Sequence, residues 1–142
     1  MRAARAADEE RLRELTFESK AHWGYDHGRV RGWADELSFP DDCERWVAEA
    51  DGELLGWAGL AAPAGGVAVL DHLWVAPGCH GRGIGTRLFR RAADRARELG
   101  AERLEWSAEV NAVGFYEKVG GRKLREHVTD WGRAAPWMGL EL

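Results

Sequence analysis

The segment Val67-Ala-Val-Leu-Asp-His-Leu-Trp-Val75, the loop Ala76-Pro-Gly-Cys-His-Gly-Arg-Gly-Ile-Gly85 and the residues that follow decide how this chain folds. In the first segment, apolar side chains occupy both odd and even positions, which predicts a strand buried on both faces. Pro77 cannot donate to a strand ladder and ends that strand. Apolar residues then recur at helical spacing over residues 86–99, opposite an arginine-rich face, and Gly100 supplies the stop.

The glycine loop is placed to bind an anion. The first N–H groups of a helix have no partner within it and concentrate positive partial charge. His80-Gly-Arg-Gly-Ile-Gly85 lies at such a helix start, and its alternate glycines let the backbone approach a phosphate closely. Arg82 and Arg87 add positive charge at the same place. A lone glycine pattern is often only a flexible helix entry, but its position between a central strand and a basic helix favours a phosphate cradle.

Composition limits the classes of function. The 142 residues, 45% hydrophobic and 31% charged, are typical of one globular domain, which we expect to span residues 1–142. The net charge of −4 argues against nucleic acid as a partner, and no apolar run is long enough to span a membrane. Cys43 and Cys79 lack a metal-binding or disulfide spacing, and no leader peptide is evident. We therefore expect free thiols, no metal and a cytoplasmic location.

A short strand and a helix are expected at the start of the chain. Residues 1–5 are a weak edge strand, and residues 8–20 a helix with Leu12, Leu15 and Ser19 facing inward. Residues 21–40 carry aromatic and acidic side chains without clear periodicity, so they form either a second short helix that packs its tryptophans or a substrate wall.

Asp51-Gly52 predicts a β-hairpin between residues 45–50 and 53–60, because this dipeptide suits a type I′ turn. Counting back from the turn pairs Ala50 with Glu53 and, four pairs on, Trp46 with Trp57. Three antiparallel strands therefore lead into the glycine loop.

The last part of the chain is expected to complete the sheet. The basic helix crosses over to a strand at residues 103–108, parallel to the central strand. Asn111 is predicted to cap a short helix that runs to Val119. Residues 123–128 and 137–142 are expected to form a closing pair of strands.

Three sequence blocks, in this order and over nearly the whole chain, resemble the GNAT superfamily of acyl-CoA-dependent N-acetyltransferases. They are Leu73-Trp-Val75, His80-Gly-Arg-Gly-Ile-Gly85, and Asn111 with Phe115-Tyr-Glu-Lys-Val-Gly120. The resemblance implies an α/β (α+β) fold: a mixed, mostly antiparallel sheet flanked by helices, whose parallel fourth and fifth strands splay apart around coenzyme A. The family commonly has Gln or Arg where His80 stands, a departure that leaves the backbone cradle unchanged.

The same resemblance implies the residues of the coenzyme site. The strand edge at Leu73 and Val75 would pair with the pantetheine arm as if it were another strand. The cofactor-binding set as a whole is Leu73, Trp74, Val75, His80, Gly81, Arg82, Gly83, Ile84, Gly85, Thr86, Asn111 and Phe115. Tyr116 would face the sulfur as general acid.

The reaction implied is direct transfer of an acetyl group from acetyl-CoA to a primary amine, since no serine or cysteine stands in a nucleophile motif. An amine is mostly protonated at pH 7, so a base must take its proton. Asp71, the one carboxylate of the central strand, is our candidate. His72 should point to the opposite face unless a bulge exchanges the two, and His72 or a water chain are the alternatives.

The acceptor is expected to be a small-molecule amine. Asp26, Asp35 and Glu36 lie among aromatic residues, and such a negative mouth suits a cation. The predicted substrate-binding residues are His22, Trp23, Tyr25 and Glu36.

Two other classes stay open. One is a non-catalytic acyl-CoA-binding module that keeps the cradle without turnover. The other is a nucleotide-binding oxidoreductase in which Glu105 would bind a ribose, although the three antiparallel strands before the glycine loop argue against it. A homodimer is compatible with the eight tryptophans and the closing strands.

Overall fold

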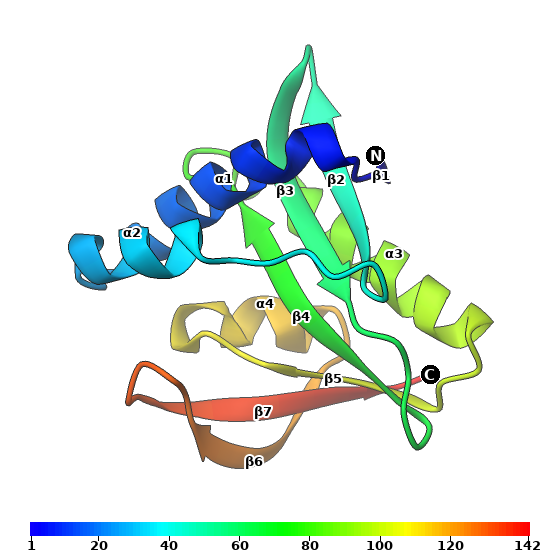
Figure 1. Ribbon diagram of the computed structural model, residues 1–142. Helices are drawn as coiled ribbons and strands as arrows, with labels where there is room; N and C mark the ends of the chain where they lie inside the picture. Colours follow the sequence, from blue (N-terminus) through cyan, green and yellow to red (C-terminus); the bar gives the residue numbers. More distant parts are fainter.

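The computed structural model describes residues 1–142, with four α-helices around one seven-stranded sheet (Figure 1). The strands are β1 (Arg2–Ala3), β2 (Glu44–Ala50), β3 (Glu53–Leu60), β4 (Val67–Val75), β5 (Arg103–Ser107), β6 (Arg122–Val128) and β7 (Ala134–Glu141). The helices are α1 (Glu9–Ala21), α2 (His27–Asp35), α3 (Ile84–Glu98) and α4 (Val113–Lys118), with short 3₁₀ turns η1 (Ala6–Asp8) and η2 (Val110–Ala112). No helix is long and apolar enough to cross a membrane.

The strand order is β1-β2-β3-β4-β5-β7-β6, and every neighbouring pair is antiparallel except β4 and β5. This confirms the predicted mixed, mostly antiparallel sheet with one parallel pair. The closing strands are also confirmed, although β7 begins at Ala134 and lies between β5 and β6.

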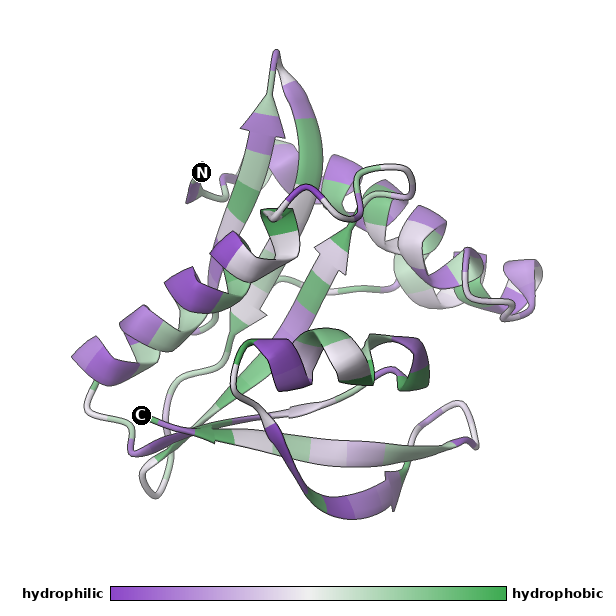
Figure 2. Ribbon diagram, turned by 180° about the vertical axis from the view of Figure 1, so that it is seen from behind, coloured by the Kyte–Doolittle hydropathy of each residue, from purple (hydrophilic) through white to green (hydrophobic).

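Apolar side chains cover both faces of the sheet. From α3, Leu88, Phe89 and Ala92 are buried in the larger cluster, and the arginine-rich side of the same helix faces outward (Figure 2). On the other face, Leu12 and Leu15 of α1 belong to a smaller cluster. A helix with one apolar face packs in this way because burying that face removes it from water.

The hairpin is confirmed, but the predicted pairing of Trp46 with Trp57 is wrong. Ala50 lies opposite Glu53 as expected. A β-bulge then leaves Leu55 without a partner, and Trp57 lies opposite Val47. Because a bulge adds one residue to one strand, it shifts every later pair by one position. The two tryptophans consequently lie in different clusters, one on each face of the sheet.

β4 and β5 pair over only three residues. Val67–Val69 lie opposite Arg103–Glu105, and the two strands then diverge (Figure 1). A second bulge occurs just beyond this point, where Gly59 lies opposite His72, Leu60 lies opposite Leu70, and Asp71 has no partner. The sheet thus opens at the C-terminal half of β4, as the resemblance implies.

The glycine loop leads into α3 two residues earlier than predicted. Gly83 is the N-cap residue, with a left-handed φ of 77° and no side chain to cap the helix. At the other end, Leu99 is the C-cap residue and Gly100 has φ 85°, as the predicted stop requires.

The prediction that Asn111 caps the short helix is wrong. Asn111 lies inside η2, the N-cap residue of α4 is Ala112, and neither element has a side-chain cap. The side chain of Asn111 instead donates from Nδ2 to Oε1 of Glu109 at 2.9 Å. This bond uses the Nδ2 donor, whereas a cap would need the side-chain oxygen of Asn111 to accept a backbone N–H.

Gly56 of β3 permits the close contact between α3 and the sheet. A Cβ atom at this position would lie 2.7 Å from the carbonyl oxygen of Trp74 and 3.0 Å from Cδ1 of Leu88. We expect Gly56→Ala to lower the free energy of unfolding by about 1–3 kcal/mol, because the added methyl group overpacks the core. Urea unfolding followed by tryptophan fluorescence measures this change.

Gly32→Ala is the matched control. No atom lies within 4 Å of a Cβ at this helical position, so the variant should gain about 0.5–1 kcal/mol from the better helix propensity of alanine. Equal effects of the two substitutions would contradict the packing argument.

Candidate active site

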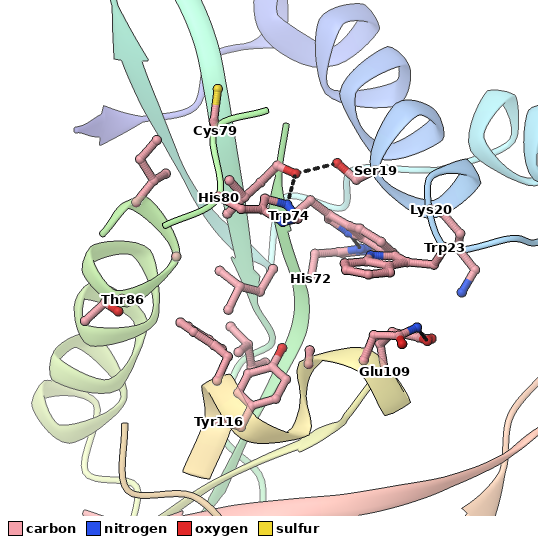
Figure 3. A pocket seen from close by; sticks show the side chains of 18 of the residues that line it. Ser19, Lys20, Trp23, His72, Trp74, Cys79, His80, Thr86, Glu109 and Tyr116 are labelled. Atoms are coloured by element: carbon pink, nitrogen blue, oxygen red, sulfur yellow. Dashed lines mark hydrogen bonds between the residues drawn. The ribbon is translucent and has the colours of Figure 1, made fainter. Parts of the chain in front are cut away.

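A cavity of about 400 Å³ opens where β4 leaves β5 (Figure 3). Its walls come from the end of α1, the second half of β4, the glycine loop, the first turn of α3, and the segment from β5 to α4. Of the predicted cofactor-binding set it is lined by Leu73, Trp74, Val75, His80, Gly81, Gly83, Ile84, Gly85, Thr86, Asn111 and Phe115, together with Asp71 and Tyr116. Arg82 is exposed and does not line it; its Nη1 donates to Sγ of Cys79 at 3.7 Å.

The glycine loop has the features of an anion cradle. Gly81 and Gly83 have φ values of 79° and 77°, and no atom lies within 4 Å of where their Cβ atoms would be. The first N–H groups of α3 have no acceptor inside the helix, and no side chain caps them. The residues present therefore fit a phosphate or diphosphate at this helix start.

The end of β4 carries an unusual hydrogen-bonding arrangement. The carbonyl oxygen of Val75 accepts the Oγ–H of Ser19 at 2.9 Å, and Nε2 of His80 lies 3.3 Å from the same oxygen (Figure 3). Trp23 stacks on His80, with ring centroids 5.9 Å apart. His22 contacts both of these rings edge-on without lining the cavity. Sequence reasoning placed Ser19 on the inner face of its helix but gave it no role.

Tyr116 is buried among aromatic side chains and still reaches the cavity. Its ring centroid lies 5.1 Å from that of Trp106 and 5.1 Å from that of Phe115. Burial raises the pKa of Tyr116 above that of an ordinary tyrosine. The phenol therefore holds its proton at neutral pH.

Asp71 and His72 differ in their readiness to accept a proton. Desolvation raises the pKa of the Asp71 carboxyl. His72 stacks on Trp57, its Nδ1 accepts the indole N–H of Trp74 at 3.1 Å, and burial lowers its pKa to about 4. His72 is thus neutral near pH 7, with one ring nitrogen already hydrogen-bonded.

Glu109, a residue that sequence reasoning missed, also lines the cavity. The phenol of Tyr25 donates to Oε2 of Glu109 at 2.6 Å, and Asn111 donates to the other oxygen. Burial, followed by this hydrogen bond, raises the pKa of Tyr25 to about 12. The available signal was the place of Glu109 just beyond a strand that ends at the opening.

The acidic mouth expected from the sequence is not formed. Asp26 caps α2 by accepting the N–H of Arg29, and Asp35 forms an ion pair with Arg31. Glu36 is exposed at the C-terminal end of α2 and does not line the cavity. Trp23 and Tyr25 are the two predicted substrate residues that do line it.

Lys20 lines the cavity instead, held among aromatic rings that come from four separate segments. Its Nζ lies 4.1 Å from the ring centroid of Tyr25, 4.9 Å from Trp131, 5.6 Å from Trp33 and 5.9 Å from Trp74. Burial lowers the pKa of Lys20. The expected short helix at residues 21–40 exists as α2, and its Trp33 packs against Trp74 and Trp131.

The carboxylate of Glu105 already has partners within the protein. It is buried, accepts the indole N–H of Trp137 at 2.6 Å and pairs with Arg103, so its carboxylate is not free for a nucleotide ribose.

Cys43 and Cys79 are free thiols, as predicted. No group of three or more His, Cys, Asp or Glu side chains is arranged to hold a metal ion.

A mixed sheet that opens between two parallel strands, with a glycine loop and a tyrosine at the opening, is the arrangement that the resemblance to N-acetyltransferases implies. Residues 7–121 match the Acetyltransferase (GNAT) family. The chain belongs to this family.

Individual relatives agree with this assignment. The chain is 44% identical to a blasticidin-S acetyltransferase of Streptomyces morookaense over 57 residues, which are 37% of this chain and 40% of that protein. It is 41% identical to a streptothricin acetyltransferase of Streptomyces lavendulae over 76 residues, which are 50% of this chain and 40% of that protein. The matches thus cover less than half the length of these relatives.

Among solved structures, the PaiA N-acetyltransferase of Thermoplasma acidophilum, in complex with coenzyme A, superposes with a TM-score of 0.76 at 23% identity. The alignment covers 96% of this chain and 94% of the other. At this identity the likeness concerns the fold.

Proposed function

We propose that the protein is an N-acetyltransferase that moves an acetyl group directly from acetyl-CoA to a primary amine of a small molecule. The observation that carries the proposal is one cavity shared by the glycine cradle, the half of β4 that does not pair with β5, and Tyr116. Two relatives are named for acetylating antibiotics, and coenzyme A is bound by a protein of the same fold.

Coenzyme binding is assigned to backbone groups. The N–H groups from Gly81 to Thr86 hold the pyrophosphate, and Arg82 adds charge from the surface. The edge at Leu73–Val75 binds the pantetheine arm, with the Val75 carbonyl shared with Ser19. The bound acetyl-CoA supplies a thioester, an activated acyl group with a good leaving atom.

Tyr116 is proposed as the general acid. Its raised pKa keeps the proton on Oη at neutral pH, and the phenol is part of the cavity wall. A proton held there is available to the departing sulfur. A positioned acid of this kind contributes about 10²–10⁴-fold to a rate.

Asp71 is proposed as the base. It lines the cavity at the bulge of β4, and its raised pKa lies closer to the range that a base at neutral pH needs. His72 is the weaker candidate, because its low pKa makes it a poor proton acceptor. Both oxygens of Glu109 already accept hydrogen bonds, from Tyr25 and from Asn111.

The cradle is tested by Gly83→Val. The side chain would force a β-branched residue into a left-handed conformation and fill the open space of the cradle. We expect at least about tenfold weaker acetyl-CoA binding, or about 1.4 kcal/mol, by isothermal titration calorimetry. Gly52→Val introduces the same strain in the distant hairpin turn, where φ is 81°, and should bind normally. Equal binding by both variants would exclude the cradle.

The reaction is tested by acetyl-CoA consumption over a panel of small amines. Tyr116→Phe should lower kcat about 10²-fold or more with little change in acetyl-CoA affinity, because the ring stays and only the proton is lost. Unchanged turnover would remove the acid role. Binding of acetyl-CoA without consumption by any amine would mean a non-catalytic binding module.

The base is tested by the pH dependence of kcat. Only the ionised carboxylate accepts a proton, so the rate should fall as pH drops through the pKa of Asp71, which lies above its ordinary value. Asp71→Asn should be slow and lack this acid limb, whereas Glu109→Gln should retain it. The opposite pattern would identify Glu109 as the base.

A further inference from the structure

Lys20 is the one lysine or arginine that lines the cavity. Lys20 forms no salt bridge or hydrogen bond, although its side chain is half-buried and lines the cavity. Its three N–H donors are therefore held in place by aromatic rings alone. An ammonium ordered in this way needs little further loss of conformational freedom to bind an anion.

Two arginines reinforce this charge on the same aromatic rings. Cζ of Arg133 lies 3.9 Å from the ring centroid of Tyr25, and Cζ of Arg29 lies 4.2 Å from that of Trp131. These are the two rings nearest to Nζ of Lys20. Neither arginine forms a salt bridge. Beyond the larger effects of burial and of Glu109, repulsion by both arginines helps to lower the pKa of Lys20.

The negative charge that faces Lys20 comes from Glu109. That carboxylate accepts hydrogen bonds from Tyr25 and Asn111, which fix it on the wall of the cavity. Asp71 is the other carboxylate that lines the cavity, and it lies at the bulge of β4. Lys20 on the cavity wall and the exposed Arg29 and Arg133, which lie over two of the same rings, thus form a cationic cluster beside these carboxylates.

We propose that the acceptor is an amine that also bears a carboxylate, as amino acids do, with this carboxylate bound by Lys20 at the cavity wall and attracted by the nearby charges of Arg29 and Arg133. The amino group then lies on the side of Glu109 and Asp71. This inference rests on the proposed function and narrows the class of acceptor from amines in general to amines that bear a carboxylate. A polycationic amine lacks a partner for the cationic cluster and is repelled by it.

The test compares matched acceptors that differ only in a carboxylate: phenylalanine with phenethylamine, and leucine with isoamylamine. Rates are expressed per unprotonated amine, because the carboxylate also changes the amine pKa. We expect the wild-type kcat/KM to be at least about tenfold higher for each amino acid than for its matched amine, because only the amino acid has a carboxylate that Lys20 can bind. Equal values would overturn the proposal.

Lys20→Met removes the charge and keeps an apolar chain among the rings. The KM for phenylalanine should rise about tenfold or more with little change in kcat, while phenylalaninamide, which lacks the carboxylate, should be unaffected. Lys123→Met removes a charge from the exposed strand β6 and should change neither value. A Lys20→Met enzyme that instead gains activity on the diamine cadaverine would show that the rings receive the ammonium of the substrate, and would overturn the proposal.

A binding measurement separates this inference from the proposed function. Phenylalanine should alter the fluorescence of the tryptophans around Lys20 in the wild-type protein and not in Lys20→Met. If binding depends on Lys20 but no amine is acetylated, the carboxylate site stands and the transferase activity fails. If amines are acetylated without any preference for a carboxylate, the activity stands and the carboxylate site is excluded.

Discussion

The short pairing of β4 with β5 is the constraint around which the rest of this structure is arranged. β4 is bonded to β3 along most of its length but to β5 only over Val67–Val69. Backbone polar groups beyond that point need partners from elsewhere, since unpaired buried groups are costly. Ser19 and His80 supply such partners at Val75, and a ligand with amide groups can supply others. The edge of β4 that lacks a partner in β5 therefore costs stability, and it leaves backbone groups that a ligand can bind.

Two β-bulges shape the strands that form this edge. Leu55, which has no partner in β2, uses its carbonyl to accept the N–H of Ala76, just beyond β4. Asp71, which has no partner in β3, lines the cavity, and Leu70 and Leu73 on either side of this bulge belong to the same apolar cluster. Because bulges bend a strand and increase its twist, they contribute to the divergence of β4 from β5. Gly56 then allows α3 to lie close against the sheet.

The two halves of the cavity depend on different parts of the chain. The half proposed to bind the coenzyme is lined by one continuous stretch, from β4 to the first turn of α3, so its sequence pattern is local. The half proposed to bind the acceptor is lined by residues from the end of α1, the segment after it and the β5–α4 segment, with Lys20, Tyr25 and Glu109 as examples. A fold can keep the first half constant while the second half changes with the substrate.

Sequence patterns predicted the elements well where the physical signal was local. Three elements were placed within about two residues: β4 from its continuous apolar run, the hairpin turn from Asp51-Gly52, and α3 from its amphipathic pattern. The same reasoning failed for the Trp46–Trp57 pair, because a bulge leaves no clear mark in the sequence. It also failed for Asn111, which lies inside η2 and whose side-chain Nδ2 donates to a carboxylate two residues earlier.

The sequence by itself determined the strand, glycine loop and helix, the hairpin before them and the family to which the chain belongs, since each depends on neighbouring residues. Only the tertiary structure decided which charged side chains line the cavity. Asp26 caps α2, Asp35 forms an ion pair within α2, and Glu36 is exposed. Lys20, in contrast, lies among aromatic rings from distant segments. Which charges share a cavity depends on contacts between residues far apart in the chain, and no local pattern encodes them.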